Sequence, residues 1–249
     1  IKTGPKVKIL KKNDKVCLSW VPSSGYNSGG TYYYDKNKKK VNAGPVNTFS
    51  NYAIVSENKV IKLPKKCNFK KDVLMGCAIP TAFNAVFNTL KKSKKNNILI
   101  IGSGGLGLAC IFACKLAGFK KIYVLDKIKE KLKIAKKFGA TNIILVSEKN
   151  SFKKLINLKG LFENAIECSG SIDLMKNSLN ALKDFGGKLI IIGNYPHKKL
   201  AKLDPWNFIM GKTITGAWQD KFLYEKSFKK FYKYFSKFNS NLFFGKKTY

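Results

Sequence analysis

Arginine is absent from the sequence and histidine occurs once, at His197, so the residue types that most often read nucleic acids and bind metals are almost missing. The six cysteines contain no Cys-x-x-Cys pair, which argues against a zinc ribbon and a disulfide framework. The longest apolar runs are about ten residues, too short to cross a bilayer. These absences predict a cytoplasmic protein with reduced thiols and no membrane partner.

Charge is abundant but one-sided: 48 basic residues stand against 14 acidic ones, a net charge of +34. Such a balance usually indicates a nucleic-acid or anionic-membrane partner. Here every basic residue is lysine, whereas proteins that read nucleic acids rely on the planar fork of arginine. The lysines are also spread along nearly every surface segment. We therefore predict a solvated lysine surface and no specific nucleic-acid partner, with a nucleic-acid-binding protein as the most distant alternative.

The 249 residues are 45% hydrophobic and 13% aromatic, enough for a sizeable core and too apolar for a disordered polycation. The first 65 residues contain short β-branched stretches separated by turn residues, which predict strands. The expected strands cover 7–10, 15–20, 52–55 and 60–63. Between them, 21–47 is expected to be a loop. Asp72 is expected to cap a helix over 73–77, which Pro80 interrupts before it resumes over 81–90.

From residue 97 onward, apolar stretches alternate with amphipathic ones. Strands are expected over 97–102, 121–126, 142–146, 165–168 and 188–193, with a sixth over 213–218. Helices are expected over 105–118, 127–138, 151–158 and 172–183, and an aromatic-rich helix that packs into a core over 221–237. Continuous apolar strands that alternate with helices indicate a parallel sheet covered on both faces. The predicted fold class is therefore α/β with a doubly wound parallel sheet.

A glycine-rich turn lies between the first of these strands and its helix. It reads Gly102-Ser103-Gly104-Gly105-Leu106-Gly107, the GxGxxG spacing of dinucleotide-binding turns. Gly102 permits a tight turn, Gly104 lets a pyrophosphate approach the backbone, and Gly107 lets the helix pack close to the sheet. The pyrophosphate would lie on the free N–H groups of the helix start, at Gly105 and Leu106. A glycine-rich turn in some other α/β fold is the alternative.

Asp126 ends the next strand, about twenty residues after the turn, where dinucleotide-binding proteins place an acidic residue. A carboxylate there accepts hydrogen bonds from the ribose hydroxyls of NAD and repels the 2′-phosphate of NADP. No arginine follows it, although Lys127 could offset part of the repulsion. NAD is therefore the expected cofactor, and NADP is less favoured.

Several motifs together resemble a known family. They read MGCAIPT at 75–81, EKL at 130–132, FGAT at 138–141, ECSG at 167–170 and IIG at 191–193, with weaker matches at 13–16 and 44–51. Over nearly its whole length the chain resembles the medium-chain, zinc-type alcohol dehydrogenases. The resemblance implies a partial, β-rich GroES-like catalytic domain over 1–77, a Rossmann dinucleotide-binding domain over 78–218, and a return to the catalytic domain over 219–249.

The resemblance also implies roles for individual residues. Cys77 falls on one ligand of the catalytic zinc, and a thiolate suits zinc. Thr81 falls where the family contacts the nicotinamide, as the expected catalytic residue. Lys131 falls on the lysine that reaches the adenosine ribose. Gly170 and Gly193 would let the backbone approach the nicotinamide half.

Departures from the family pattern limit what this stretch of sequence offers. The family's other two catalytic-zinc ligands lie upstream of the matching region, so we expect a fragment that lacks both termini, and His197 is expected to be a surface residue. Residues 22–34 lack the four cysteines of the family's structural-zinc lobe, so no structural zinc is expected. Ala82 and Asn84 replace smaller residues of the family near the nicotinamide.

The expected function is NAD-dependent oxidation of a primary or secondary alcohol, with sugars and polyols among the candidates, or the reverse reduction, with zinc assistance in the full-length protein. The small-molecule alcohol or carbonyl substrate is left open. The family implies a homodimer or homotetramer joined through the strand over 213–218. A zinc-free quinone or enone reductase of the same superfamily, and a non-catalytic dinucleotide-binding paralogue, are the alternatives.

Overall fold

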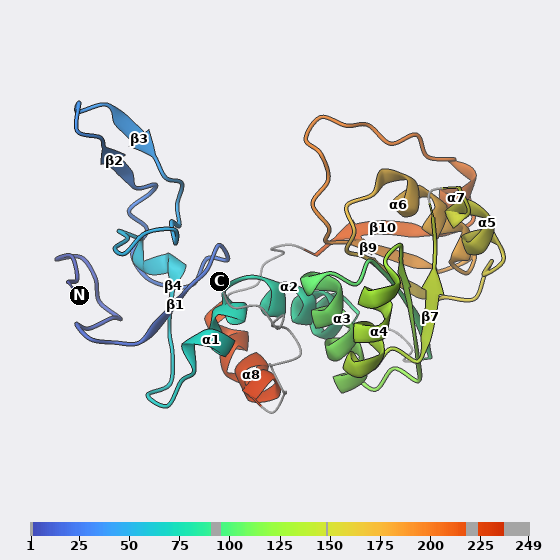
Figure 1. Cartoon of the computed structure of the whole chain (residues 1–249), viewed down its shortest axis with the longest axis horizontal. Coiled ribbons are helices and arrows are strands. Elements are labelled where there is room, and N and C mark those ends of the chain that lie inside the picture. The colour runs from blue at the N-terminus through green and yellow to red at the C-terminus, as the bar shows by residue number, and fades with distance from the viewer. Residues whose placement is uncertain (1, 91–95, 148, 218–223, 237–249) are drawn as a thin grey trace. The chain divides into compact units, whose positions relative to one another are not determined.

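The computed structural model describes residues 2–90, 96–147, 149–217 and 224–236 (Figure 1). They form two compact units. The first comprises the described residues of Ile1–Pro80 together with helix α8 (Tyr224–Ser236), and the second comprises those of Thr81–Asp220. The remaining parts of the predicted segment 219–249 lie outside the described residues. No helix in the described part of the chain combines the length and the hydropathy that a membrane crossing requires.

The second unit is built on a six-stranded parallel sheet. Its strands are β5 (Asn97–Ile101), β6 (Lys121–Asp126), β7 (Asn142–Leu145), β8 (Asn164–Glu167), β9 (Lys188–Ile191) and β10 (Thr213–Gly216). They lie in the order β10-β9-β8-β5-β6-β7, so β5 pairs with β8 although β6 and β7 intervene in the chain. This is the order of a doubly wound dinucleotide-binding sheet, in which two three-stranded halves meet. The α/β prediction is confirmed.

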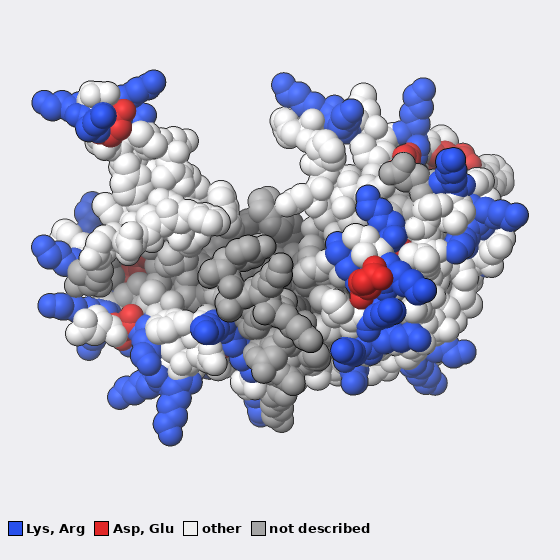
Figure 2. Space-filling model, viewed as in Figure 1, with Lys and Arg blue, Asp and Glu red and all other residues white. Residues whose placement is uncertain are grey.

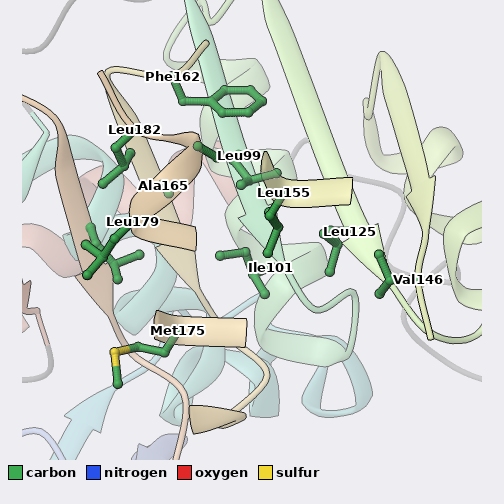
Figure 3. Packing of buried hydrophobic residues seen from close by; sticks show 12 residues of the cluster. Leu99, Ile101, Leu125, Val146, Leu155, Phe162, Ala165, Met175, Leu179 and Leu182 are labelled. Carbon is green, nitrogen blue, oxygen red and sulfur yellow. The ribbon is translucent and has the colours of Figure 1, made fainter. Parts of the chain in front are cut away.

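Helices cover both faces of this sheet. They are α3 (Gly105–Leu116), α4 (Lys129–Phe138), α5 (Ser151–Ile156), α6 (Ile172–Ser178), the short turn η4 (Leu179–Ala181) and α7 (Trp206–Ile209). Because both faces are covered, the consecutive residues from Ile98 to Ile101 of β5 are all fully buried. Figure 3 shows a core of this unit, where Leu99 and Leu125 from the sheet meet Leu155 of α5.

The first unit contains only short strands. β1 (Val16–Leu18) pairs with β4 (Val60–Lys62) and β2 (Tyr32–Tyr34) pairs with β3 (Lys40–Asn42), both antiparallel. The remaining elements of this part of the chain are η1 (Glu57–Lys59), α1 (Phe69–Asp72), η2 (Val73–Gly76) and the start of α2 (Ala78–Asn84), which runs on into the π-helical turn η3 (Ala85–Thr89). Helix α8 buries Phe228, Phe231 and Phe235, which confirms that its aromatic residues pack in a core.

Two of the strands predicted for the first unit are wrong. Residues 7–10 form no strand because the N–H groups of Lys8, Ile9 and Leu10 donate to one carboxylate oxygen, Glu57 Oε1, at 3.0, 2.6 and 3.3 Å. Residues 52–55 form none either, since the backbone of Ile54 bonds to side chains: its N–H donates to the Tyr33 hydroxyl at 2.9 Å and its carbonyl accepts from the Thr31 hydroxyl at 2.8 Å. In both segments side-chain partners replace the ladder of a sheet.

The predicted loop over 21–47 contains the β2–β3 hairpin, which the sequence reading missed. Asp35 closes its turn, because one carboxylate oxygen accepts from the N–H groups of Asn37 and Lys39, both at 2.8 Å. Lys38 adopts the left-handed conformation there, with φ of 60°. Aspartate side chains commonly stabilise turns in this way. The lysine-rich composition of the turn hid the hairpin.

The helix starts predicted around Asp72 and Pro80 are also corrected. Asp72 stands at the N-cap position of η2, but its side chain makes no capping bond there. The side-chain cap belongs to the preceding helix, α1, where Asn68 Oδ1 accepts from the N–H of Lys71 at 3.3 Å. Asp72 ends α1, and its carboxylate accepts from the Asn68 N–H and from the Tyr232 hydroxyl, each at 2.9 Å. Pro80 is the third residue of α2 and does not interrupt it. A proline is tolerated there because the first N–H groups of a helix need no intrahelical acceptor.

Lysine side chains are spread over the visible face of both units, with few acidic side chains among them (Figure 2). The ion pairs among described residues include Lys62 with Asp14 at 2.7 Å and Lys183 with Glu163 at 3.2 Å. Most of the positive charge is therefore left to solvent and counterions.

Candidate functional site

A cavity of about 390 Å³ opens in the second unit, where the strands of the parallel sheet end. Gly102 follows β5, Asp126 ends β6, Val146 follows β7 and Ser169 follows β8, and all four line the cavity. Between β5 and β8 the direction in which strands are added to the sheet reverses. Open α/β sheets bind ligands at such a point, outside the carboxyl ends of their strands. The cavity therefore has the position of a dinucleotide site.

The glycines of the turn after β5 separate into two kinds. Gly102 has a φ of +89°, and a Cβ there would lie 3.0 Å from the Cβ of Ser169, while a Cβ on Gly107 would lie 2.0 Å from the carbonyl oxygen of Gly102. These two positions are closed by the protein itself. Gly104 and Gly105 instead face open space, with nothing within 4 Å of an added Cβ. The open pair leaves room for a ligand beside the backbone.

Helix α3 starts directly on this open pair. Its first residue is Gly105, its N-cap is Gly104, and no side chain caps it. The first N–H groups of a helix have no intrahelical acceptor, and the positive end of the helix dipole lies at the same place. A diphosphate fits both features, so the residues present suit the pyrophosphate of a dinucleotide. Leu106, in the first turn of α3, is half-buried.

Asp126 is held in a fixed position at the end of β6. Its Oδ2 accepts from both the N–H and the hydroxyl of Ser103, each at 2.7 Å, and its Oδ1 accepts from the N–H of Ile128 at 2.9 Å. The residue is 8% exposed and lines the cavity. A carboxylate has about four acceptor sites, so these bonds leave it able to accept from a ligand hydroxyl. The sequence reading missed the role of Ser103, which occupies a variable position of the GxGxxG turn.

Two lysines stand beside this carboxylate on the cavity wall. Lys131 is exposed on α4 and Lys127 precedes that helix. The structure thus brings Gly102, Gly104, Asp126 and Lys131 to one cavity, as four members of the predicted cofactor-binding set.

Gly170 and Gly193 lie on the loops that follow β8 and β9. The space that a side chain would need at either glycine is occupied by atoms of the neighbouring segment. A Cβ on Gly170, whose φ is +71°, would lie 2.1 Å from the carbonyl oxygen of Asn194. A Cβ on Gly193 would lie 2.6 Å from the nitrogen of Gly170 and 2.7 Å from Glu167 Oε2. These two glycines therefore allow one loop to pack closely on the other. That they let the backbone approach the nicotinamide half stays a prediction.

A buried carboxylate, which the sequence reading passed over, joins the same two loops. Glu167 ends β8, is fully buried, and accepts at Oε1 from the N–H of Ser169 at 2.7 Å and from the Ser169 hydroxyl. At Oε2 it accepts from the Tyr195 hydroxyl at 2.5 Å. The signal was present in the sequence, since a glutamate that ends a buried apolar strand has to be paired.

The two residues predicted for zinc and nicotinamide chemistry lie in different units. Cys77 belongs to the first unit, between η2 and α2, where it is exposed at the surface although partial burial raises the pKa of its thiol. Thr81 belongs to the second unit, in α2, and is buried. His197 is exposed, as expected of a surface residue.

Asn84 is tied to the end of β10. Its amide nitrogen donates to the carbonyl oxygen of Ala217 at 2.9 Å, and its Oδ1 accepts from Asn88. Asn84 therefore has a structural role in the second unit.

Zinc requires three or four cysteine, histidine or carboxylate ligands. Within the described ranges, no three such side chains form a group that could hold a metal ion. Cys77 is a candidate for one ligand, and the described residues by themselves do not fit a complete zinc site.

Comparison with known proteins agrees with this geometry. The chain is 32% identical over 175 residues to an alcohol dehydrogenase class-3 of Drosophila melanogaster, an alignment that covers 68% of this chain and 46% of the relative. It is 28% identical over 176 residues to an S-(hydroxymethyl)glutathione dehydrogenase of Photobacterium damsela, over 68% of this chain and 47% of the relative. The chain thus spans about half the length of the curated relatives it matches.

Solved structures share the fold. Benzyl alcohol dehydrogenase from Acinetobacter calcoaceticus superimposes with a TM-score of 0.75 at 25% identity, over 96% of this chain and 72% of that one. A protein from Sinorhizobium meliloti bound to NADP superimposes with a TM-score of 0.70 at 16% identity, over 93% and 69% of the two chains. The sequence profile described as zinc-binding dehydrogenase matches residues 105–237. The match includes the start of α3, Asp126, and the loops after β8 and β9 that Glu167 joins. With more than half of its residues in that match and the dinucleotide crevice in place, the chain belongs to the zinc-binding dehydrogenase family.

Proposed function

We propose that this chain is the cofactor-binding part of an NAD-dependent alcohol dehydrogenase, which transfers hydride between a small-molecule alcohol or carbonyl compound and the nicotinamide. One observation carries the proposal: Gly104, which faces open space at the start of α3, and the fixed carboxylate of Asp126 line one cavity at the reversal point of the sheet. The names of the relatives, alcohol dehydrogenase and S-(hydroxymethyl)glutathione dehydrogenase, support an alcohol as the substrate class.

The preference for NAD over NADP rests on Asp126. Ser103 and Ile128 fix its carboxylate with three hydrogen bonds, so it cannot turn away from a ligand. A fixed carboxylate accepts from the ribose hydroxyls of NAD and repels a 2′-phosphate. Lys127 and Lys131 line the same cavity and reduce that repulsion without removing the carboxylate. We therefore expect NADPH to bind more weakly than NADH, and not to be excluded.

Further residue roles belong to the same proposal. Gly104, Gly105 and Leu106 hold the pyrophosphate, Gly102 and Gly107 allow the tight turn and the close helix packing beside it, and Lys131 reaches the adenosine ribose. Thr81 contacts the nicotinamide, and Gly170 and Gly193 shape the loops that receive it. Cys77 supplies one ligand to the zinc of the whole protein, which we expect to be a cytoplasmic homodimer or homotetramer. The six free cysteines suit a reducing compartment.

A fluorescence titration of the chain with NADH and, in parallel, NADPH tests this proposal. We expect saturable binding that favours NADH. Asp126→Ala should weaken the binding of NADH by about tenfold and should change the affinity for NADPH less. The matched control is Asp173→Ala, which removes the same charge from the same cavity at an exposed position. The proposal fails if the folded chain binds neither nucleotide, if it prefers NADPH, or if both variants weaken NADH equally.

A further inference from the structure

The two halves of a doubly wound sheet each receive one half of a dinucleotide. The glycine turn and Asp126 belong to the half made by β5, β6 and β7, so that half takes the adenosine and pyrophosphate. The nicotinamide half then falls on the carboxyl ends of β8 and β9. The chain there consists of two short loops, 168–171 and 192–195, whose positions decide how the nicotinamide is held.

Glu167 connects the backbones of these two loops. Its carboxylate accepts from the N–H groups of Ser169 at 2.7 Å and Gly170 at 3.2 Å in the loop after β8. Its main-chain carbonyl accepts from the N–H groups of Ile192 at 3.0 Å and Gly193 at 2.9 Å in the loop after β9. One fully buried residue thus fixes both loops at their starts.

Tyr195 connects the end of the second loop to the same glutamate. Its hydroxyl donates to Glu167 Oε2 at 2.5 Å, and its ring packs against the apolar cluster between the sheet and α6. Desolvation and the adjacent carboxylate raise the pKa of Tyr195, so the hydroxyl keeps its proton and remains a donor. A hydrogen bond to a buried carboxylate is among the stronger ones in a protein.

We propose that Tyr195, acting through Glu167, is a positioning residue that holds the loops after β8 and β9 in the arrangement that receives the nicotinamide half of the cofactor. This inference rests on the proposed function and adds a residue to it. Without the hydroxyl, Glu167 keeps its backbone donors and Gly170 still packs on Gly193, so the fold survives. The main-chain bonds of Ile192 and Gly193 still hold the start of the second loop, but its end at position 195 loses the side-chain bond to Glu167, and the site for the nicotinamide loses its fixed shape.

The test compares two probes that differ in the nicotinamide ring. NADH contacts both halves of the site, whereas ADP-ribose lacks the ring and depends mainly on the glycine turn and Asp126. Binding of each is measured for the wild type, for Tyr195→Phe and for Tyr123→Phe. Tyr123 is the matched control because it packs on the same apolar cluster while its hydroxyl makes no hydrogen bond within the described residues.

Tyr195→Phe should weaken the binding of NADH by about tenfold and change the affinity for ADP-ribose by less than about twofold. Tyr123→Phe should change neither affinity. Unchanged NADH binding by Tyr195→Phe overturns the inference and leaves the proposed function intact. Equal weakening of both probes also overturns it, since the hydroxyl would then support the whole domain. Failure of the wild type to bind either probe overturns the proposed function, and the inference with it.

Discussion

The two units of this chain are stabilised in different ways. In the second unit, parallel strands are buried on both faces, and an apolar cluster from β5, β6, β8 and the helices forms the core. In the first unit the four strands have three residues each, and buried carboxylates satisfy backbone N–H groups that no sheet pairs. Glu57 alone accepts from four of them. Repeated apolar packing thus specifies one unit, and individual polar contacts specify the other.

The largest effect should come from the close packing of α3 on the turn after β5 in the second unit. Gly107→Ala places a Cβ 2.0 Å from the carbonyl oxygen of Gly102, and overpacking against backbone should cost about 3 kcal/mol of the free energy of unfolding. Gly105→Ala, in the same helical turn, faces open space and should stay within about 1 kcal/mol of the wild type. Urea unfolding of both variants measures the difference. Equal effects would contradict the separation of closed and open glycines.

In the first unit, Glu57→Gln should cost about 2 kcal/mol at pH 7, since the amide group that replaces one oxygen cannot accept from the N–H of Tyr26 or from Lys8, Ile9 and Leu10. Hydrogen exchange should quicken in the first unit and remain slow in the β5–β9 strands. The control is Glu163→Gln, which breaks an ion pair with Lys183 on the surface of the second unit and should cost less than about 1 kcal/mol. Equally faster hydrogen exchange in both units would show that the contacts of Glu57 do not stabilise the first unit specifically.

The same carboxylate predicts a pH dependence. Desolvation raises the pKa of Glu57, but the four N–H donors outweigh it and leave the pKa below its ordinary value of 4.5. The stabilisation is therefore complete above pH 4.5 and is lost as the pH falls through the folded value. The stability difference between wild type and Glu57→Gln should shrink over that range, and a constant difference would contradict the assignment.

A smaller effect is expected where α8 joins α1. Tyr232→Phe removes the hydrogen bond to Asp72, which is 2% exposed, and should cost about 1 kcal/mol. Amide exchange should quicken in α8 and around Asn68, which also binds that carboxylate. Tyr34→Phe is the control, because Tyr34 is 69% exposed in the same unit. Unchanged exchange in α8 would show that its apolar face alone holds it.

The comparison also explains what the sequence could predict. Every strand of the parallel sheet was expected within one or two residues, because buried strands and amphipathic helices repeat a pattern. The glycine turn and Asp126 were found for the same reason, since a local spacing defines them. The hydrogen-bonding roles of Glu57 and Asp35 could not be predicted in this way, because no repeated pattern marks their partners. Some partners of Glu57 lie nearly fifty residues away in the chain.

The partners of Glu167 and Asp126 could not be predicted for a related reason. A charged residue at the end of a buried strand signals that a partner exists, but the sequence does not name it. Tyr195 is 28 residues from Glu167, and Ser103 is 23 residues from Asp126. Only the sheet order brings these pairs together.

The hydrogen bond between Tyr232 and Asp72 joins residues 160 positions apart, and it affects the order of events during synthesis. The described residues of the second unit all lie between Thr81 and Asp220, so its parallel sheet can form as soon as the ribosome has released β10. The first unit begins earlier but needs α8, which is translated after the whole parallel sheet. Residues 2–80 are therefore translated before the parallel sheet, while the helix that completes their core is translated after it.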